Sequence, residues 1–260
     1  MSYALQDTAT MLRRNLRHAQ RYPGISLGTL GMPVVMVLLF GVVFGKTFKT
    51  GIGGGGNFDY IDFLIPGILL ITVTSGTMGP AVAICTDMAE GVVARFRTMA
   101  IFRPAVLTGA VLGSALQILA SLALVIGFAL LIGFRPNASF GEWLLVIGLL
   151  VALTFAFTWF AVALGLVSKT PEGASNIVLP LNLVLPFLST TFIPLDAMPK
   201  GLKWFAEYQP FTPIIETLRH LLIGTPNESG NGWLAIAWCV AIVVVGYFWA
   251  QKNYNKGTVA

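Results

Sequence analysis

The sequence is poor in charge. Only 10% of its 260 residues are Asp, Glu, Lys or Arg, whereas 56% are hydrophobic. Soluble domains carry about 25% charged residues, so this chain has too little charge to cover a water-facing surface. The net charge is +5, but the basic residues fall between apolar blocks. This distribution favours contact with a membrane surface and argues against a nucleic-acid partner.

Cysteine, histidine and catalytic motifs are also scarce. The two cysteines, Cys85 and Cys239, lie far apart, whereas a disulfide framework or a zinc site needs several at short spacing. The two histidines, His18 and His220, are equally isolated. No HExxH, GxSxG or Cys/His cluster occurs. The sequence therefore predicts no catalytic residue, no metal site and no cofactor on this chain, and we expect that it is not an enzyme.

Long apolar runs are what the sequence has in abundance. A transmembrane helix needs about 20 apolar residues with few or no charges. Six windows without an ionisable residue meet this requirement: 23–45, 63–86, 104–134, 143–168, 173–195 and 229–251. The third is longer than a simple span, which predicts a tilted or emerging helix. Pro180 and Pro186 interrupt the fifth, which predicts a kink. The predicted fold is an all-α membrane protein with six transmembrane helices.

The distribution of Lys and Arg predicts the orientation of these helices. Ten of the 16 basic residues fall in the segments on the same side as the N-terminus, and six fall on the other side. Basic residues are enriched in cytoplasmic segments. We therefore expect both termini, including a tail at 252–260, to be cytoplasmic.

Two segments on the predicted inner side have helical patterns. In residues 1–22, Leu5, Leu12 and Leu16 share one face while arginines share another, which suits a helix lying in the headgroup region; a positive topogenic tail is the alternative. In the loop 86–104, Val92 and Phe96 recur at helical spacing among acids and arginines. This pattern predicts either a short helix that docks into a protein groove or a solvated loop.

The segment 196–224 lies on the predicted outer side before the last span. It is half apolar and contains Trp204, Phe205, Tyr208 and Phe211. Aromatic residues collect at membrane interfaces. The segment therefore predicts two short interfacial helices, with a passive aromatic belt as the alternative.

The predicted spans hold mild polar groups in place of ionisable ones. Ion-coupled pumps use intramembrane carboxylates or histidines, which all six windows lack. Any uphill transport would therefore draw its energy from a partner at an inner loop. Candidates for lining a pathway for an amphipathic solute are Asn176, Asn182, Ser189, Thr190 and Thr191. Hydrogen bonding between packed helices is the alternative role for these residues.

Several blocks resemble the permeases of ABC-2-type transporters, in particular their daunorubicin/doxorubicin-resistance branch. These blocks are the stretch from Asp87 to Leu107 with its Arg-Phe-Arg core, Phe63 to Gly67, Phe192 to Pro199, and Gln209 to Gly224. The resemblance extends over about residues 20–250.

The resemblance implies a transmembrane domain at 23–251, an N-terminal connecting helix at 1–22, interfacial or re-entrant outer helices at 197–224 and a coupling helix at 87–98. The coupling residues that it implies are Asp87, Glu90, Gly91, Arg95, Phe96 and Arg97. It further implies a separate ATP-binding cassette subunit that binds ATP and Mg, and a second permease, identical or paralogous, in a bacterial cell membrane.

These expectations lead to a functional hypothesis with two alternatives. The hypothesis is a permease subunit that exports a lipophilic or amphipathic compound, such as a drug or a lipid, driven by the separate ATPase. The first alternative keeps the family but makes the cargo a lipid-linked glycan, with aromatic residues such as Trp159, Phe187 and Phe192 along the channel. The second is a membrane channel or scaffold without an ATPase partner.

Overall fold

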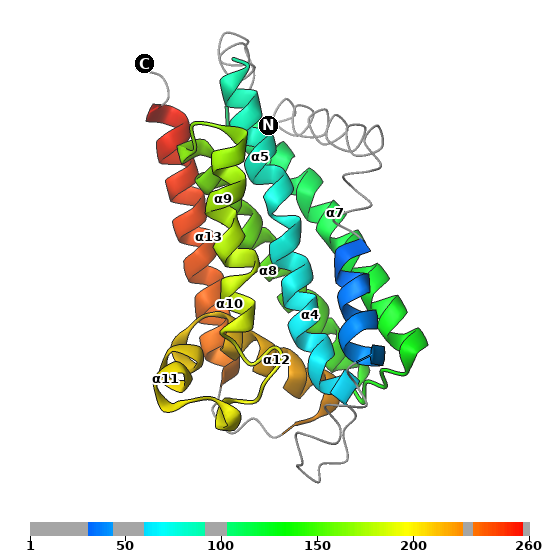
Figure 1. Cartoon of the computed structure of the whole chain (residues 1–260). Helices are drawn as coiled ribbons and strands as arrows, with labels where there is room; N and C mark the ends of the chain where they lie inside the picture. Colours follow the sequence, from blue (N-terminus) through cyan, green and yellow to red (C-terminus); the bar gives the residue numbers. More distant parts are fainter. Residues whose placement is uncertain (1–30, 44–59, 92–102, 226–230, 257–260) are drawn as a thin grey trace.

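Long helices lie side by side through most of the molecule (Figure 1). The computed structural model describes residues 31–43, 60–91, 103–225 and 231–256. The elements are η1 Val37–Val43, α4 Tyr60–Gly76, α5 Met78–Ala89, α7 Arg103–Ile132, α8 Phe140–Val167, α9 Pro171–Asn182, α10 Val184–Phe187, η2 Leu195–Ala197, α11 Lys200–Tyr208, α12 Phe211–Ile223 and α13 Asn231–Lys256. No strand occurs within these ranges, so the predicted all-α class is confirmed for them.

Four helical segments are long and apolar enough to cross a membrane: Tyr60–Ala89, Leu107–Ile132, Phe140–Val167 and Gly232–Tyr254. They correspond to the second, third, fourth and sixth predicted windows. The structure therefore supports four of the six predicted spans. The first window is described only over 31–43, where Gly31–Phe40 forms a shorter apolar helix. The predicted connecting helix at 1–22 lies outside the described residues.

The fifth window, 173–195, is not one continuous helix. α9 ends at Asn182, α10 covers only four residues, and an irregular turn follows from Leu188. Pro186 has no N–H to offer to the carbonyl of Asn182, four residues earlier, and this is where α9 stops. The predicted interruption is confirmed, and the window holds two helical segments, α9 and α10, in place of one continuous helix.

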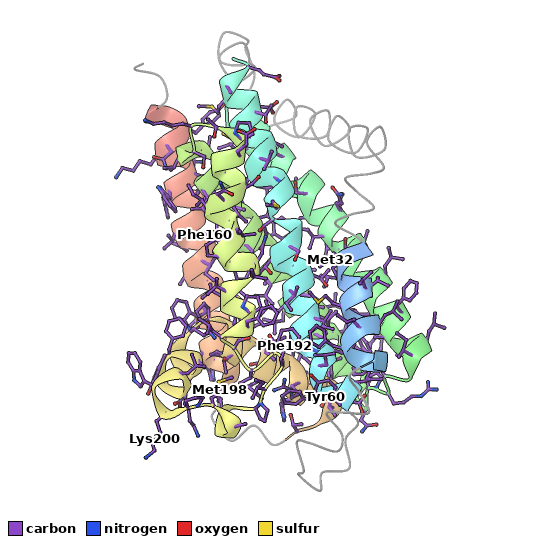
Figure 2. All side chains as sticks on the ribbon, viewed as in Figure 1. Met32, Tyr60, Phe160, Phe192, Met198 and Lys200 are labelled. Carbon is purple, nitrogen blue, oxygen red and sulfur yellow. The ribbon has the colours of Figure 1, made fainter. Side chains whose placement is uncertain are left out.

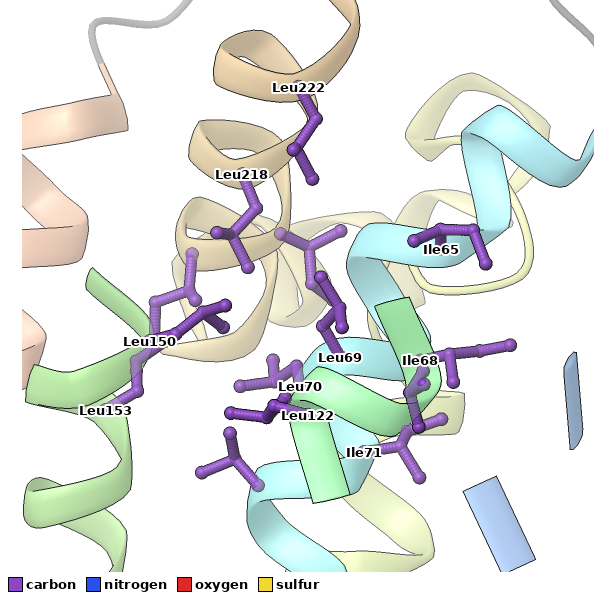
Figure 3. Packing of buried hydrophobic residues seen from close by; sticks show 14 of the residues in the cluster. Ile65, Ile68, Leu69, Leu70, Ile71, Leu122, Leu150, Leu153, Leu218 and Leu222 are labelled. Carbon is purple, nitrogen blue, oxygen red and sulfur yellow. The ribbon is translucent and has the colours of Figure 1, made fainter. Parts of the chain in front are cut away.

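α4 lies at the centre of the bundle. Its residues from Leu64 to Thr74 are all buried, which marks a helix surrounded by protein on every side. Figure 3 shows its isoleucines and leucines facing Leu122 of α7, Leu150 of α8 and Leu218 of α12. The hydroxyl of Thr72 donates to the carbonyl of Ile68 at 2.7 Å. The helix thus satisfies its own buried hydroxyl group.

Glycines allow the closest helix crossings. At Gly246 of α13, an added Cβ would lie 2.8 Å from the backbone nitrogen of Phe160 on α8. Gly165 of α8 meets the backbone of α5 at Ala81 in the same way. Small residues let transmembrane helices approach closely. These contacts fix α8 between α5 and α13.

Capping residues place the turns at the two ends of the bundle. Ser139 and Glu142 form a reciprocal capping box at the start of α8, and Thr170 caps α9 by accepting from the N–H of Gly173 at 3.0 Å, as orphan donors at helix N-termini require. The α7–α8 turn lies at the same end as α11 and α12 (Figure 1). The α8–α9 turn lies at the opposite end, near the ends of α5 and α13.

Candidate functional site

A buried arginine connects three segments at the end of the bundle that carries α11 and α12. Arg219 of α12 is only 4% exposed. Its Nη2 donates to the carbonyls of Phe63 at 3.0 Å and Thr190 at 2.9 Å, and its Nη1 pairs with Glu216 at 2.5 Å. The guanidinium also lies 3.8 Å from the centroid of the Phe63 ring. One side chain therefore joins α12, the start of α4 and the turn after α10.

The environment of Arg219 offsets much of the cost of burying its charge. A buried charge is tolerated when it is paired and hydrogen-bonded. Burial lowers the pKa of Arg219, and the nearby Glu216 carboxylate opposes this shift. From the sequence, Arg219 counts among the six basic residues on the predicted outer side. The available signal was Glu216 three residues earlier, a spacing that brings two side chains together on a helix.

The structure brings three of the predicted pathway residues together. Ser189, Thr190 and Thr191 lie in the turn after α10 and are 1% exposed or less. The hydroxyls of Ser189 and Thr191 are 2.8 Å apart, and that of Ser189 donates to the carbonyl of Pro186 at 2.6 Å. Thr191 packs so tightly on α4 that a Cβ at Gly67 would lie 2.5 Å from its Cγ2. In this conformation the three residues are packed in the interior and line no open passage.

The other two predicted pathway residues lie elsewhere. Asn176 is exposed on α9, and Asn182 is half-buried at the end of that helix. Buried side-chain atoms of Asn182 (Oδ1), Thr190 (Oγ1) and Arg219 (Nε) have no hydrogen-bond partner among the described residues. Gln209 has a comparable orphan Oε1, although its Nε2 donates to the carbonyl of Leu188 at 2.5 Å. Of these atoms, Oγ1 of Thr190 lies in the turn 189–191 itself and has unused hydrogen-bonding capacity.

The aromatic residues considered for a glycan channel do not form one line. Phe187 and Phe192 stack with centroids 4.8 Å apart, and Phe40 lies 4.8 Å from Phe192 (labelled in Figure 2). Trp159 instead packs edge-on against Tyr247 of α13 at 5.1 Å. No group of three or more His, Cys, Asp or Glu suited to a metal ion occurs in the described part of the chain.

The predicted coupling segment begins inside α5. Asp87 lies in the last turn of this helix and is half-buried, while Glu90 is its exposed C-cap. Gly91 follows with φ +69°, a left-handed conformation that ends helices and favours glycine. α5 thus runs past the predicted boundary at 87 and stops before Gly91. Arg95, Phe96 and Arg97 lie outside the described residues.

The end of α5 rests on the turn between α8 and α9. The thiol of Cys85 lies 3.4 Å from the carbonyl of Ser168. Lys169 and Glu172 in this turn are exposed beside it. The two segments together present acidic and basic side chains at the end of the bundle opposite α11 and α12 (Figure 1).

Comparison with known proteins finds a matching family and related permeases. Residues 6–223 match the family of ABC-2 type transporters. The chain is 29% identical to the daunorubicin resistance ABC transporter permease protein DrrB1 of Streptomyces coeruleorubidus over 94% of this chain and 84% of that protein. It is 28% identical to the putative transport permease ycf38 of Cyanophora paradoxa, over 89% and 77% of the two chains. It is 22% identical to the probable doxorubicin resistance ABC transporter permease protein DrrC of Mycobacterium tuberculosis, over 91% and 84%.

Proposed function

The chain belongs to the ABC-2 type transporter family, and we propose that it is the membrane permease subunit of an exporter that moves a lipophilic or amphipathic compound out of the cytoplasm or the inner leaflet. The family match over residues 6–223 is the observation that carries this proposal. The names of the relatives from Streptomyces and Mycobacterium, both drug-resistance permeases, support export of a drug-like compound. The four long apolar helices supply the membrane-embedded body that such a subunit needs.

The energy for transport comes from a separate ATP-binding cassette subunit, the partner that the family implies. ATP and Mg bind to that subunit. In the described spans, the ionisable residues lie toward helix ends, as Asp62 and Asp87 do in Tyr60–Ala89. Proton coupling would use ionisable groups within the spans. This distribution favours an external energy source.

The partner docks where α5 ends. Glu90 is exposed there, Asp87 lies one turn earlier, and the left-handed Gly91 turns the chain into the segment with Arg95, Phe96 and Arg97. Docking at this segment moves α5, which packs against both α8 and α9. The shift reaches the turn 189–191 through α9 and α10 and exposes its unused polar atoms to the transported compound.

The remaining assembly follows from the same family. A second permease copy, identical or paralogous, completes the transporter in a bacterial plasma membrane. The end of the bundle with α5 and the C-terminal end of α13 faces the cytoplasm, as do both termini. α11 and α12 lie at the outer interface, where exposed Trp204 and Tyr208 suit the headgroup region.

Recovery of the assembled transporter tests the proposal. The tagged chain is extracted from its host in several mild detergents, and its partners are identified and counted by mass spectrometry. We expect an ATP-binding subunit at about one copy per permease. Consistent failure to recover such a subunit would favour the channel or scaffold function instead.

A paired substitution tests the docking role. Glu90→Ala combined with Arg95→Ala is expected to abolish ATP-driven export and to release the ATP-binding subunit. Glu207→Ala provides a matched control, because Glu207 is an exposed glutamate on α11 at the other end of the bundle. Intact export by the double variant would show that docking does not use this segment.

A further inference from the structure

An apolar cavity lies beside the joint of α9 and α10, which precedes the turn 189–191 in the chain. It has a volume of about 290 Å³ and lies between α8, the joint of α9 and α10, the start of α12, and α13. Its wall includes Phe157, Phe160, Leu185, Phe211 and Trp238, and Phe160 is labelled about midway along the bundle in Figure 2. The cavity thus extends from the middle of the bundle toward the end that carries α11 and α12, where Pro210 and Phe211 line it.

The side chains that line the cavity determine which ligand groups it can accommodate. They include no charged, amide or hydroxyl side chain. A charged or strongly polar group placed here would lose its hydration without gaining a partner. The part of any ligand that enters is therefore neutral and apolar.

Four of the lining side chains are aromatic, and they come from three helices. Phe157 and Phe160 belong to α8, Phe211 to α12, and Trp238 to α13. Phe157 and Phe211 already meet edge to face at 5.7 Å. Aromatic rings favour one another through offset-stacked and edge-to-face contacts. This concentration of rings suits a flat aromatic group better than a flexible acyl chain, which gains only from apolar area.

The route into the cavity comes from the membrane. Ala241 lines the cavity and is exposed on α13. Leu183 and Val184, at the joint of α9 and α10, are 52% and 47% exposed. Between these exposed apolar surfaces, the cavity opens toward surrounding hydrocarbon. A ligand therefore arrives by partitioning out of the bilayer, without first crossing the polar cluster around Arg219.

We propose that this cavity binds the neutral aromatic portion of a lipophilic compound taken from the bilayer. The site deepens the proposed export function and rests on it for its physiological meaning. The transported compound is bound there beside α9 and α10, the elements that precede the turn 189–191 in the chain. The break between Asn182 and Val184 lies in the cavity wall itself, between the lining residues Leu181 and Leu185.

The test uses pyrene, a neutral flat aromatic compound, and the full chain with its ATP-binding partner in lipid nanodiscs. Energy transfer from tryptophan to pyrene is measured against empty nanodiscs, and its saturable component reports the site. We expect Trp238→Phe to lower this component more than substitution of an exposed tryptophan does, because Trp238 lies in the cavity wall and energy transfer falls steeply with distance. Trp233→Phe is its control, because Trp233 is 82% exposed on the same helix and does not line the cavity.

A second pair of variants fills the cavity without adding a tryptophan. Ala241→Phe is expected to weaken saturable pyrene binding by about tenfold. Ala237→Phe, one turn away, exposed and outside the lining, is expected to leave binding within about twofold. A strictly linear signal, or equal binding by both variants, would overturn the site. Displacement of pyrene by hexadecanol as effectively as by anthracene would overturn the aromatic preference.

The same nanodisc preparations test the cavity site and the proposed export function separately. Association of the ATP-binding subunit is counted in each nanodisc preparation. An associated subunit with no saturable pyrene binding refutes the cavity site and leaves the export function standing. Saturable binding by the permease without any associated subunit supports the site and counts against export driven by that subunit.

Discussion

Arg219 joins three segments at the end of the bundle that carries α11 and α12. Replacing it by leucine leaves the carbonyls of Phe63 and Thr190 without their donor and Glu216 without its cation. Breaking a buried ion pair by removing one partner costs about 3 kcal/mol. We expect a loss of this size in the free energy of unfolding, measured by denaturant titration of the purified protein in detergent.

Arg135 offers the matched control for this substitution. It lies at the same end of the bundle but is exposed, so Arg135→Leu should change the free energy of unfolding by no more than about 0.5 kcal/mol. Equal losses for the two leucine variants would mean that the contacts of Arg219 contribute no specific stability.

Gly67 is the second residue with a sharp structural requirement. A Cβ at this position would lie 2.5 Å from Cγ2 and 2.9 Å from Cα of Thr191, and a backbone atom cannot move aside cheaply. Overpacking of this kind costs about 1–3 kcal/mol. Gly67→Ala should therefore lower the unfolding midpoint. Gly79→Ala, where nothing lies within 4 Å, should raise it through better helix propensity.

The sequence predicted only some of the residues that cluster around Arg219. Ser189, Thr190 and Thr191 were singled out because polar residues in an apolar window are unusual. Their contact with Arg219 was not predicted, since it joins positions 29 residues apart, and the Phe63 contact joins positions 156 apart. No local periodicity encodes such a pairing, because it depends on how α4 and α12 pack.

At the scale of elements, the end of α5 gives a prediction about coupling. Gly91 adopts φ +69°, where an L-residue with a Cβ costs about 1–2 kcal/mol. Gly91→Ala should misdirect the chain after α5 and reduce recovery of the ATP-binding subunit in a pull-down. Gly91→Asn should retain more of it, since asparagine tolerates this conformation. A stronger loss with asparagine than with alanine would contradict the role of the turn.

Elements were more predictable than their contacts. Ion-free apolar runs located the helices that overlap 63–86, 104–134, 143–168 and 229–251, because each run is long and uninterrupted. The fifth window is divided into α9 and α10, a division that hydropathy alone does not reveal because it measures apolar content and not continuity of hydrogen bonds. Its prolines predicted the interruption, but the irregular turn after Phe187 depends on packing against α4.

At the scale of the whole molecule, the two ends of the bundle should face opposite sides of the membrane. Lys169 is exposed at the end that we place in the cytoplasm, and Lys200 is exposed at the other. Each is replaced singly by cysteine after Cys85 and Cys239 have been changed to alanine. A membrane-impermeant maleimide applied to intact cells should label the variant at 200 and spare the one at 169. The reverse pattern would invert the assigned orientation.

The burial of α4 has a consequence for how this gene tolerates change. From Leu64 to Thr74, no side chain of this helix reaches the surface, so each substitution there meets packed neighbours. α13, in contrast, turns Ile236, Val240 and Val244 outward, where one apolar side chain serves as well as another. In a library of random single substitutions selected for a folded product, survivors should be rarest along this stretch of α4 and abundant on the outward face of α13. The codons least tolerant of mutation are therefore concentrated in the part of the gene that encodes the innermost helix, α4.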